Sequence, residues 1–403
     1  MARHYLTKEF FRQIPCALLA RYFQGRGLSD GLDFSAMKEG KRDVLFGAWM
    51  YLEEGQRNEM DAEFRDIFEM SCDKGFLAII GEAPYQFRET PDAVTPFVEM
   101  LSAMPNHFER AMVTFLDHKN FWKGATRFYH ADTLSYWRKR KCLSYQPAAV
   151  DEVSIQQLAS LIRTYFHHTE GRGNNCVVEP YRRGELDYFF AFPEDYSQQA
   201  SEWVDGEFKT RPHNPAFEVI YVYSQKEGSL DLNYRGNPKS IDPLQAMFAT
   251  AILKLDELPP DPKDARVYDL APLLQKNFDF IYAPGSGIEK VTVKKLRLSS
   301  RVKKGDRITL EADATANPDA VYALLEQIGK SIQLKMYNIT LVELTASVKV
   351  DADKPAKTVP IRITHPNSCS LKYDKLGLLL RDMLEASKIE LKAPEEKVEA
   401  VEA

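Results

Sequence analysis

The chain has 403 residues, of which 44% are hydrophobic, 28% charged and 11% aromatic. This composition is typical of a globular protein of two or three domains, and it excludes disorder over most of the length. The formal net charge of −5 gives no overall attraction to polyanions, so any nucleic-acid contact would depend on local basic patches.

The cysteines and the apolar runs indicate a cellular location. Five cysteines are widely dispersed, at positions 16, 72, 142, 176 and 369, and no Cys-x-x-Cys pair occurs. Dispersed thiols are typical of a reducing compartment, and the spacing does not favour a zinc site made of cysteines. The chain begins without a secretory signal pattern and has no apolar run of about 18 residues. We therefore expect a cytoplasmic protein with no membrane contact.

Residues 1–146 are predicted to form an all-helical domain. Apolar residues recur at helical spacing in two stretches, around Met60, Phe64 and Ile67 and around Phe108 and Met112. Strand-like alternation is scarce in this part of the chain. The aromatic residues at this spacing are expected to form core, which is the usual role of such a stripe.

Residues 147–262 are predicted to form an α+β domain of four antiparallel strands flanked by two helices. Ser154 and Gln157 make a capping-box pattern at the start of the first helix. Asp242 and Pro243 begin the second, whose apolar face includes Phe248. Four short runs typical of strands lie between them: "CVVEPY", "LDYFFAF", "FEVIYVYS" and "LDLNYR".

Residues 263–392 are predicted to form a duplicated ββα domain. "VTVKKLRL", "RITLEAD" and a helix begun by Asn317 and Pro318 make one unit. "ITLVELTASVKV", "VPIRIT" and a helix from Leu371 to about Ser387 repeat the order, which indicates two hairpins in one sheet with two helices on a face. Residues 393–403 are low in complexity and acidic, and are expected to be a disordered tail.

One stretch suggests catalysis. Asp187 begins an apolar run in "GELDYF", and Glu207 and Lys209 follow in "GEFK". Two carboxylates can hold a hard divalent cation that activates water, and a lysine can stabilise the developing negative charge. The stretch resembles the central motif of the PD-(D/E)xK nuclease superfamily, with Glu170 on a preceding helix. That resemblance implies a Mg²⁺-dependent nuclease with Asp187, Glu207 and Lys209 as catalytic residues. Alternatively, Glu207 and Lys209 lie on an exposed loop or edge strand.

Two basic clusters stand out against the acidic average. Arg138 and Arg140 lie next to Trp137, whose ring could stack on a base. The second cluster follows a predicted strand and the loop after it, and contains Lys294, Lys295, Arg297, Lys303 and Lys304. Cations projecting from one sheet face could neutralise several phosphates. The other interpretation is an ordinary solvated surface or an edge strand protected by lysines.

Three functions remain open from the sequence. The first is a non-enzymatic binding or regulatory protein, with a bacterial origin as one option, that acts through a protein or nucleic-acid partner and needs no cofactor or metal. The second is the Mg²⁺-dependent nuclease, and the third is a structural subunit of a larger assembly. Nucleophile elbows and complete phosphate-binding loops do not occur in the sequence, which disfavours an enzyme.

Overall fold

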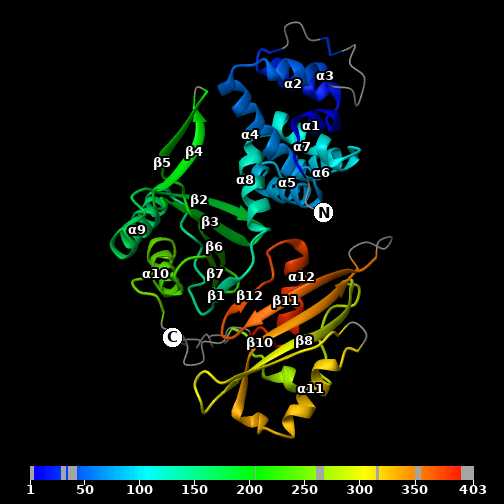
Figure 1. The fold of residues 1–403 in the computed structure, drawn as a ribbon, viewed down its shortest axis with the longest axis vertical. Helices are drawn as coiled ribbons and strands as arrows, with labels where there is room; N and C mark the ends of the chain where they lie inside the picture. Colours follow the sequence, from blue (N-terminus) through cyan, green and yellow to red (C-terminus); the bar gives the residue numbers. More distant parts are fainter. Residues whose placement is uncertain are drawn as a thin grey trace, which may run out of the picture. The chain divides into compact units, whose positions relative to one another are not determined.

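The computed structural model describes residues 4–28, 33–34, 43–204, 206–259, 267–314, 317–349 and 355–391. The chain divides into two compact units (Figure 1). The helical unit comprises Met1–Thr133 together with Arg182–Gly184, and the sheet unit comprises Leu134–Tyr181 and Glu185–Ala403. Each unit is described by itself. None of the described helices is both long enough and apolar enough to cross a membrane.

The described part of the helical unit is built from α1 to α8. Their bounds are Thr7–Gln13, Cys16–Gly25, Asp43–Met50, Glu54–Met70, Asp73–Gln86, Val94–Ala103, His107–Asp117 and Lys119–Ala131. The predicted stripe on α4 is buried, and the Phe64 ring lies 5.1 Å from that of Phe10 and 5.0 Å from that of Tyr22. Asn106 caps α7 by accepting a hydrogen bond from the Glu109 N–H.

A ten-stranded sheet forms the centre of the second unit (Figure 1). Its order is β2-β3-β6-β7-β1-β12-β11-β10-β8-β9, and every strand pair with an assigned register in it is antiparallel. The strands are β1 Trp137–Arg140, β2 Cys176–Arg183, β3 Leu186–Pro193, β6 Val219–Ser224, β7 Ser229–Tyr234, β8 Ile288–Ser300, β9 Arg307–Glu311, β10 Tyr337–Val348, β11 Lys357–Thr364 and β12 Ser368–Cys369.

The predicted fold class is wrong, because the middle of the chain does not form a separate four-stranded domain. β1 pairs with β7 on one side, where Lys139 lies opposite Asp231. On its other side β1 pairs with β12, where Trp137 lies opposite Cys369. The sheet therefore continues from the middle of the chain into its C-terminal part. Residues 137–140 were expected in an all-helical domain, yet they form the strand that joins the two halves.

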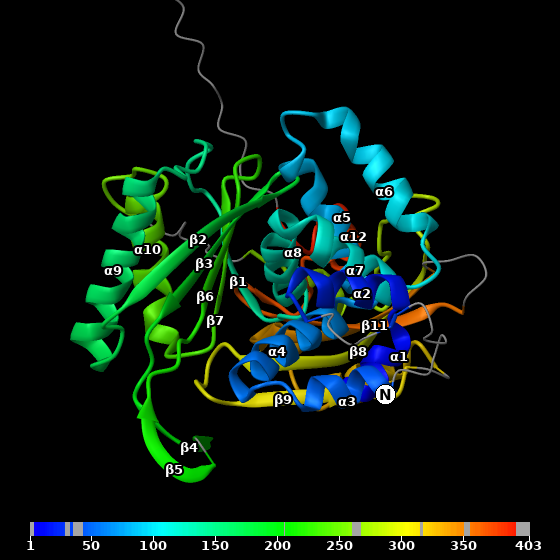
Figure 2. The ribbon, with the colours of Figure 1, turned by 90° about the horizontal axis from the view of Figure 1, so that it is seen from above.

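Helices cover one face of each half of this sheet. α9 (Glu152–Glu170) and α10 (Ile241–Ala251) lie side by side over β3, β6 and β7 (Figure 2). Phe189, Tyr221 and Phe248 are central to the core between them. In the other half, α11 (Ala320–Gly329), α12 (Lys375–Ala386) and the short helix η3 (Ala271–Leu274) pack on β8, β10 and β11.

The C-terminal half has the element order β8, β9, α11, β10, β11, β12, α12. Two hairpins followed by helices occur in the predicted order, but their strands belong to the ten-stranded sheet and not to a sheet of their own. The predicted domain boundary between residues 262 and 263 lies outside the described residues, and so does the whole acidic tail at 393–403.

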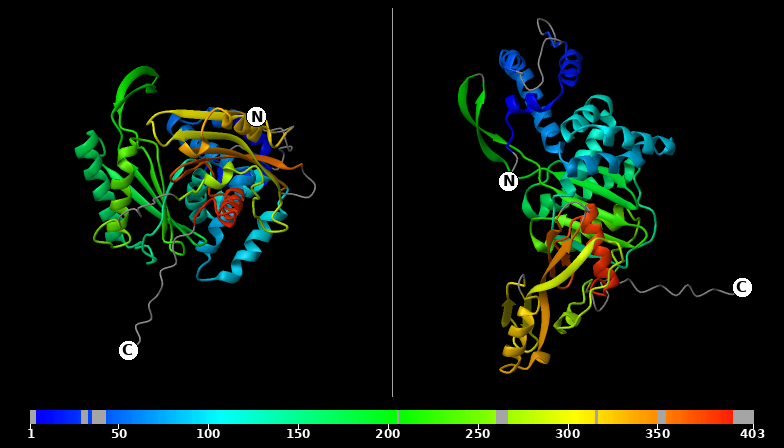
Figure 3. Two further views of the ribbon diagram at one scale, coloured as in Figure 1. Left: turned by 90° about the horizontal axis from the view of Figure 1, so that it is seen from below. Right: turned by 90° about the vertical axis from the view of Figure 1, so that its right-hand side faces the viewer.

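A separate two-stranded ribbon leaves the sheet unit between β3 and β6. Its strands are β4 (Gln198–Val204) and β5 (Glu207–His213), and they pair with each other only. The ribbon projects away from the ten-stranded sheet (Figure 3). Its residues are exposed or half-buried along the whole described length.

Candidate functional site

The ribbon of β4 and β5 has two chemically different faces. Partners in an antiparallel register have their side chains on the same face, and successive residues alternate between faces. One face therefore carries three cross-strand pairs: Trp203 with Phe208, Ser201 with Thr210, and Gln199 with Pro212. None of these six side chains is charged. We call this surface the uncharged face of the ribbon.

Two large aromatic side chains are exposed on the uncharged face. Trp203 is 69% exposed and Phe208 is 61% exposed, although their rings contact each other edge to face at 5.6 Å. Next to them the hydroxyls of Ser201 and Thr210 lie 3.2 Å apart. A contiguous exposed apolar surface with a polar border is typical of a site that binds a partner.

The opposite face of the ribbon is charged but internally neutralised. Glu207 forms an ion pair with Lys209 at 2.9 Å, and Glu202 pairs with Arg211. Ala200 lies opposite Arg211 and is the small residue of this face. The cations of the ribbon are thus already matched by carboxylates of the same ribbon.

The base of the ribbon is firmly attached to the sheet unit. Arg172 forms an ion pair with Asp195 at 2.7 Å, and its guanidinium carbon lies 3.9 Å from the centre of the Phe217 ring. The Asp195 N–H donates to Pro215 O at 2.7 Å, and the Phe217 N–H donates to Pro193 O at 2.9 Å. These backbone hydrogen bonds join the segment that leads into β4 to the segment that follows β5. They therefore fix the direction in which the ribbon leaves the unit.

The residues of the nuclease interpretation lie in different sheets. Asp187 is in β3, is 4% exposed and lies opposite Tyr223, whereas Glu207 and Lys209 are in the ribbon. Asp187 is six residues before Pro193, which at about 3.3 Å a residue places it ~20 Å from the end of β3 that leads into the ribbon. The structure does not bring the three residues together. Asp187 is also buried rather than exposed to solvent.

Metal-binding groups are not found in the described ranges. No three His, Cys, Asp or Glu side chains there are arranged to hold a metal ion. Glu170, which the nuclease resemblance included, forms an ion pair with Arg172 at 2.7 Å beside the base of the ribbon. Its position is explained by that contact.

The first basic cluster is buried, which corrects the expectation of a base-stacking surface. Trp137 has no exposed surface, and its ring contacts that of Tyr373 at 5.2 Å. Arg140 is 8% exposed and donates to the Pro259 carbonyl. Arg138, half-buried, lies opposite Leu232. The sequence could not show this, because four consecutive cations are rarely part of a central strand.

The second basic cluster is only partly available. Lys295 contacts Glu311 at 2.9 Å and Glu343 at 3.3 Å, and these carboxylates raise its pKa. Arg297 donates to the hydroxyl of Thr340. The exposed cations are Lys294, Lys303 and Lys304, of which Lys303 lies 3.4 Å from Asp306. Whether this cluster binds nucleic acid stays a prediction.

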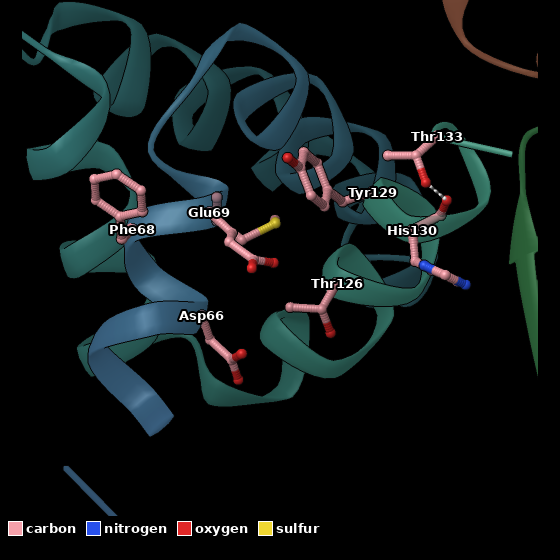
Figure 4. Close-up of a pocket in the computed structure, with 8 residues that line it drawn as sticks. Asp66, Phe68, Glu69, Thr126, Tyr129, His130 and Thr133 are labelled. Carbon is pink, nitrogen blue, oxygen red and sulfur yellow. Dashed lines mark hydrogen bonds between the residues drawn. The ribbon is translucent and has the colours of Figure 1, made fainter. Parts of the chain in front are cut away.

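A pocket of about 570 Å³ lies in the helical unit between α4 and the end of α8 (Figure 4). Asp66, Phe68, Glu69 and Met70 line it from α4, and Thr126, Tyr129, His130 and Thr133 line it from α8 and the residues after it. Burial raises the pKa of Asp66, and the charges of Glu69 and Glu63 raise it further. The lining combines two carboxylates, the hydroxyls of Thr126, Tyr129 and Thr133, the imidazole of His130 and the apolar side chains of Phe68 and Met70.

Sequence reasoning missed the aromatic pair on the ribbon. From the sequence, Glu207 and Lys209 are expected on an exposed loop or edge strand as the alternative to a nuclease site, and neither interpretation gives a role to Trp203 or Phe208. The Asp-Gly pair at 205–206, flanked by Trp203 and Phe208, is a strong hairpin signal and would have identified the ribbon. Gly206 has a φ of 76°, which glycine adopts without strain.

Comparison with known proteins identifies no relative: no family model, no curated protein and no solved structure matches this chain.

Proposed function

We propose that this protein is a non-enzymatic binding protein that docks onto a protein partner through the uncharged face of its β4–β5 ribbon. The observation that carries the proposal is the exposure of Trp203 and Phe208 on a face without charged side chains. Burying such a side chain fully contributes about 1.5–3 kcal/mol, and tryptophan is enriched among the residues that dominate binding energies.

The firm attachment of the ribbon supports the proposal. A surface that is ordered before binding loses less conformational entropy when the partner arrives. Arg172 and the backbone bonds at residues 193, 195, 215 and 217 hold the base of the ribbon in the free protein. Few side chains of the ribbon would then lose conformational freedom when the partner binds.

The charges of the ribbon favour a protein partner over a nucleic acid. Between residues 198 and 213 the sequence has three acidic residues, Glu202, Asp205 and Glu207, and two basic ones, Lys209 and Arg211. Both cations are paired with carboxylates of the ribbon. Binding to single strands combines stacking with cations along the phosphates, and the uncharged face has no cation to supply.

Site-specific photo-crosslinking in cells of the source organism tests the proposal. Phe208 is replaced by p-benzoylphenylalanine, and Val302, which is 72% exposed on the turn between β8 and β9, is replaced in a matched control. We expect a discrete protein adduct from position 208 that is absent from position 302. Adding Trp203→Ser to the position-208 variant should abolish that adduct. Equal adducts at both positions, or an adduct with nucleic acid, would contradict the proposal.

Tryptophan fluorescence provides a second measurement once the crosslinked protein is purified. Trp203 is the exposed one of the four tryptophans, since Trp49, Trp122 and Trp137 are each at least nine-tenths buried. Iodide should quench Trp203 in the free chain, and the partner should protect it. The Trp203→Phe variant should show little iodide quenching in either state. Unchanged quenching of the wild-type chain at saturating partner would show that the ribbon is not the contact surface.

A further inference from the structure

We propose that two copies of this chain associate through the outer edge of β4, so that their ribbons form one four-stranded antiparallel sheet around a two-fold axis at Ser201. The inference adds self-association to the proposed partner binding. It does not rest on the identity of the partner, because it can be measured with the purified chain alone.

Pro212 shows which backbone groups point outward. In an antiparallel ribbon, pairs that exchange two hydrogen bonds alternate with pairs whose N–H and C=O groups point away from the neighbouring strand. Pro212 has no N–H, so the Gln199–Pro212 pair must be of the second kind. Alternation then places the backbone groups of Gln199, Ser201 and Trp203 on the outer edge of β4.

The two edges of the ribbon differ in their capacity to accept another strand. On β4 all three outward residues have an N–H to donate, and all three are exposed. On β5 the outward residues are Phe208, Thr210 and Pro212, and the proline removes one donor. A strand edge with its donors and acceptors open is a template for pairing with another chain. The geometry therefore points to β4 as the pairing edge.

A two-fold axis at Ser201 gives the most complete pairing. Gln199 then lies opposite Trp203 of the second copy, Ser201 opposite Ser201, and Trp203 opposite Gln199. Each of these three pairs exchanges two hydrogen bonds, about six in all. With the axis at Gln199 or at Trp203, only the pair on the axis would exchange two hydrogen bonds within β4. The next residues that point outward would lie opposite residues beyond the end of β4 in the second copy.

The charges on the opposite face are complementary in this register. Glu202 lies opposite Ala200 of the second copy, and Ala200 lies opposite its own Arg211. Across the four strands the order is Lys209, Glu202, Ala200 of the second copy and Arg211 of the second copy. The small alanine leaves room for that arginine to reach Glu202. Each Glu202 therefore lies between Lys209 of its own ribbon and Arg211 of the second copy, and no like charges are opposite each other in this row.

The uncharged faces of both ribbons lie on the same side of the four-stranded sheet, because the axis is perpendicular to it. Ser201 and Thr210 of both copies form a central row of hydroxyls, and on each side of it Trp203 lies next to Gln199 of the second copy, with Pro212 of that copy one strand further. Pairing thus doubles the aromatic surface that the proposed partner would meet. A strand of seven residues buries much less than the ~800 Å² per subunit of a stable complex, so the dimer should dissociate on dilution.

Sedimentation velocity over about a hundredfold range of concentration tests the inference. The wild-type chain should shift from monomer to dimer as concentration rises. Ser201→Pro should raise the dissociation constant at least ~10-fold, because it removes an outward donor and leaves the bonds between β4 and β5 intact. Thr210→Pro makes the matching change on the β5 edge and should leave the dissociation constant unchanged.

A charge variant tests the register without a proline. Ala200→Glu places a carboxylate opposite the cation of Arg211 in its own ribbon, so the ribbon should still fold. In the dimer it faces Glu202 of the second copy, and the dissociation constant should rise severalfold. A chain that stays monomeric at every concentration would overturn the inference, as would dimers unaffected by both Ser201→Pro and Ala200→Glu. If the chain does not self-associate but still forms the adduct from position 208, the inference of dimerisation fails while the proposed partner binding stands.

Discussion

At the scale of single residues, Glu82 of the helical unit is a buried carboxyl group whose environment shifts its pKa. It lies on α5 with no exposed surface, and Gln86 donates to its carboxylate at 2.7 Å. Gly124 on α8 makes this position possible, because a side chain there would collide with the Glu82 carboxylate. Burial raises the pKa of Glu82 to about 7, although the Gln86 hydrogen bond and the charge of Arg183 lower it.

The raised pKa predicts how pH affects stability. The folded state holds a proton on Glu82 up to about pH 7, whereas the unfolded chain loses it near pH 4.5. The free energy of unfolding therefore falls as pH rises between these values, by about 2–3 kcal/mol. Glu82→Gln should remove this loss: urea unfolding should show a gain of that size at pH 8 and almost none at pH 4. Glu89→Gln is the control, because Glu89 is exposed and lies three residues after the end of α5. If Glu82→Gln raised the free energy of unfolding equally at pH 8 and pH 4, the stabilisation would come from packing and not from the ionisation of Glu82.

At the scale of elements, the contact of α10 with the sheet shows a helix face that the sequence predicts well. Phe248 has no exposed surface, and its ring lies 5.0 Å from Tyr221 and 5.1 Å from Phe189. The apolar spacing of residues 244–255 indicated this face without reference to the sheet that it covers. Burial of Phe248 confirms that the face points into a core.

Phe248→Ala should reduce the free energy of unfolding by roughly 3–5 kcal/mol, because the cavity between the rings of Phe189, Tyr221 and Tyr223 cannot collapse fully. Met247→Ala on the same helix is the control, since Met247 is half-buried and its truncation should cost less. Urea unfolding of both variants measures the difference. A loss below about 1 kcal/mol for Phe248→Ala would mean that the ring contributes little to packing.

At the scale of the whole sheet unit, a buried ion cluster connects the two halves of the sheet. Lys139 on β1 lies 2.8 Å from Glu390, 3.0 Å from Glu227 and 3.9 Å from Asp231. Lys139, Asp231 and Glu390 are all less than a tenth exposed. Glu390 follows α12 and forms a β-bridge with Tyr268. The cluster thus joins β1, β7 and the end of the described chain.

Removing one member should leave uncompensated charge inside the unit. Lys139→Met should reduce the free energy of unfolding by about 3–5 kcal/mol at neutral pH, whereas exposed Lys303→Met should change it by about 0.5 kcal/mol or less.

Lys139 and the other cations lower the pKa of Glu390 to about 2, against the burial that raises it. Stability from this contact is present above pH 4.5 and is lost as pH falls toward 2. The variant should lack that part of the acid dependence in urea unfolding. An unchanged acid dependence in Lys139→Met would show that Glu390 does not depend on this lysine.

Local patterns in the sequence determined the helix faces on α4, α7 and α10 and the apolar strands at residues 186–192 and 217–224. These features follow from the spacing of apolar residues along a short segment, which reports which side faces a core. The Asp-Gly turn of the ribbon was equally local, and a prediction from it would have placed Trp203 opposite Phe208.

The tertiary structure alone decided which strands are neighbours and which charges are buried. β1 pairs with β7 about ninety residues further along and with β12 about 230 residues further along, and a pattern of period two does not specify its partner. Lys139 looks like a surface residue in "WRKR" until Glu227, Asp231 and Glu390 are brought to it by other elements. Trp203 looks like a core residue until β4 and β5 pair only with each other and leave it exposed. Burial depends on contacts between distant segments, and a residue's type and its immediate neighbours in the chain do not record those contacts.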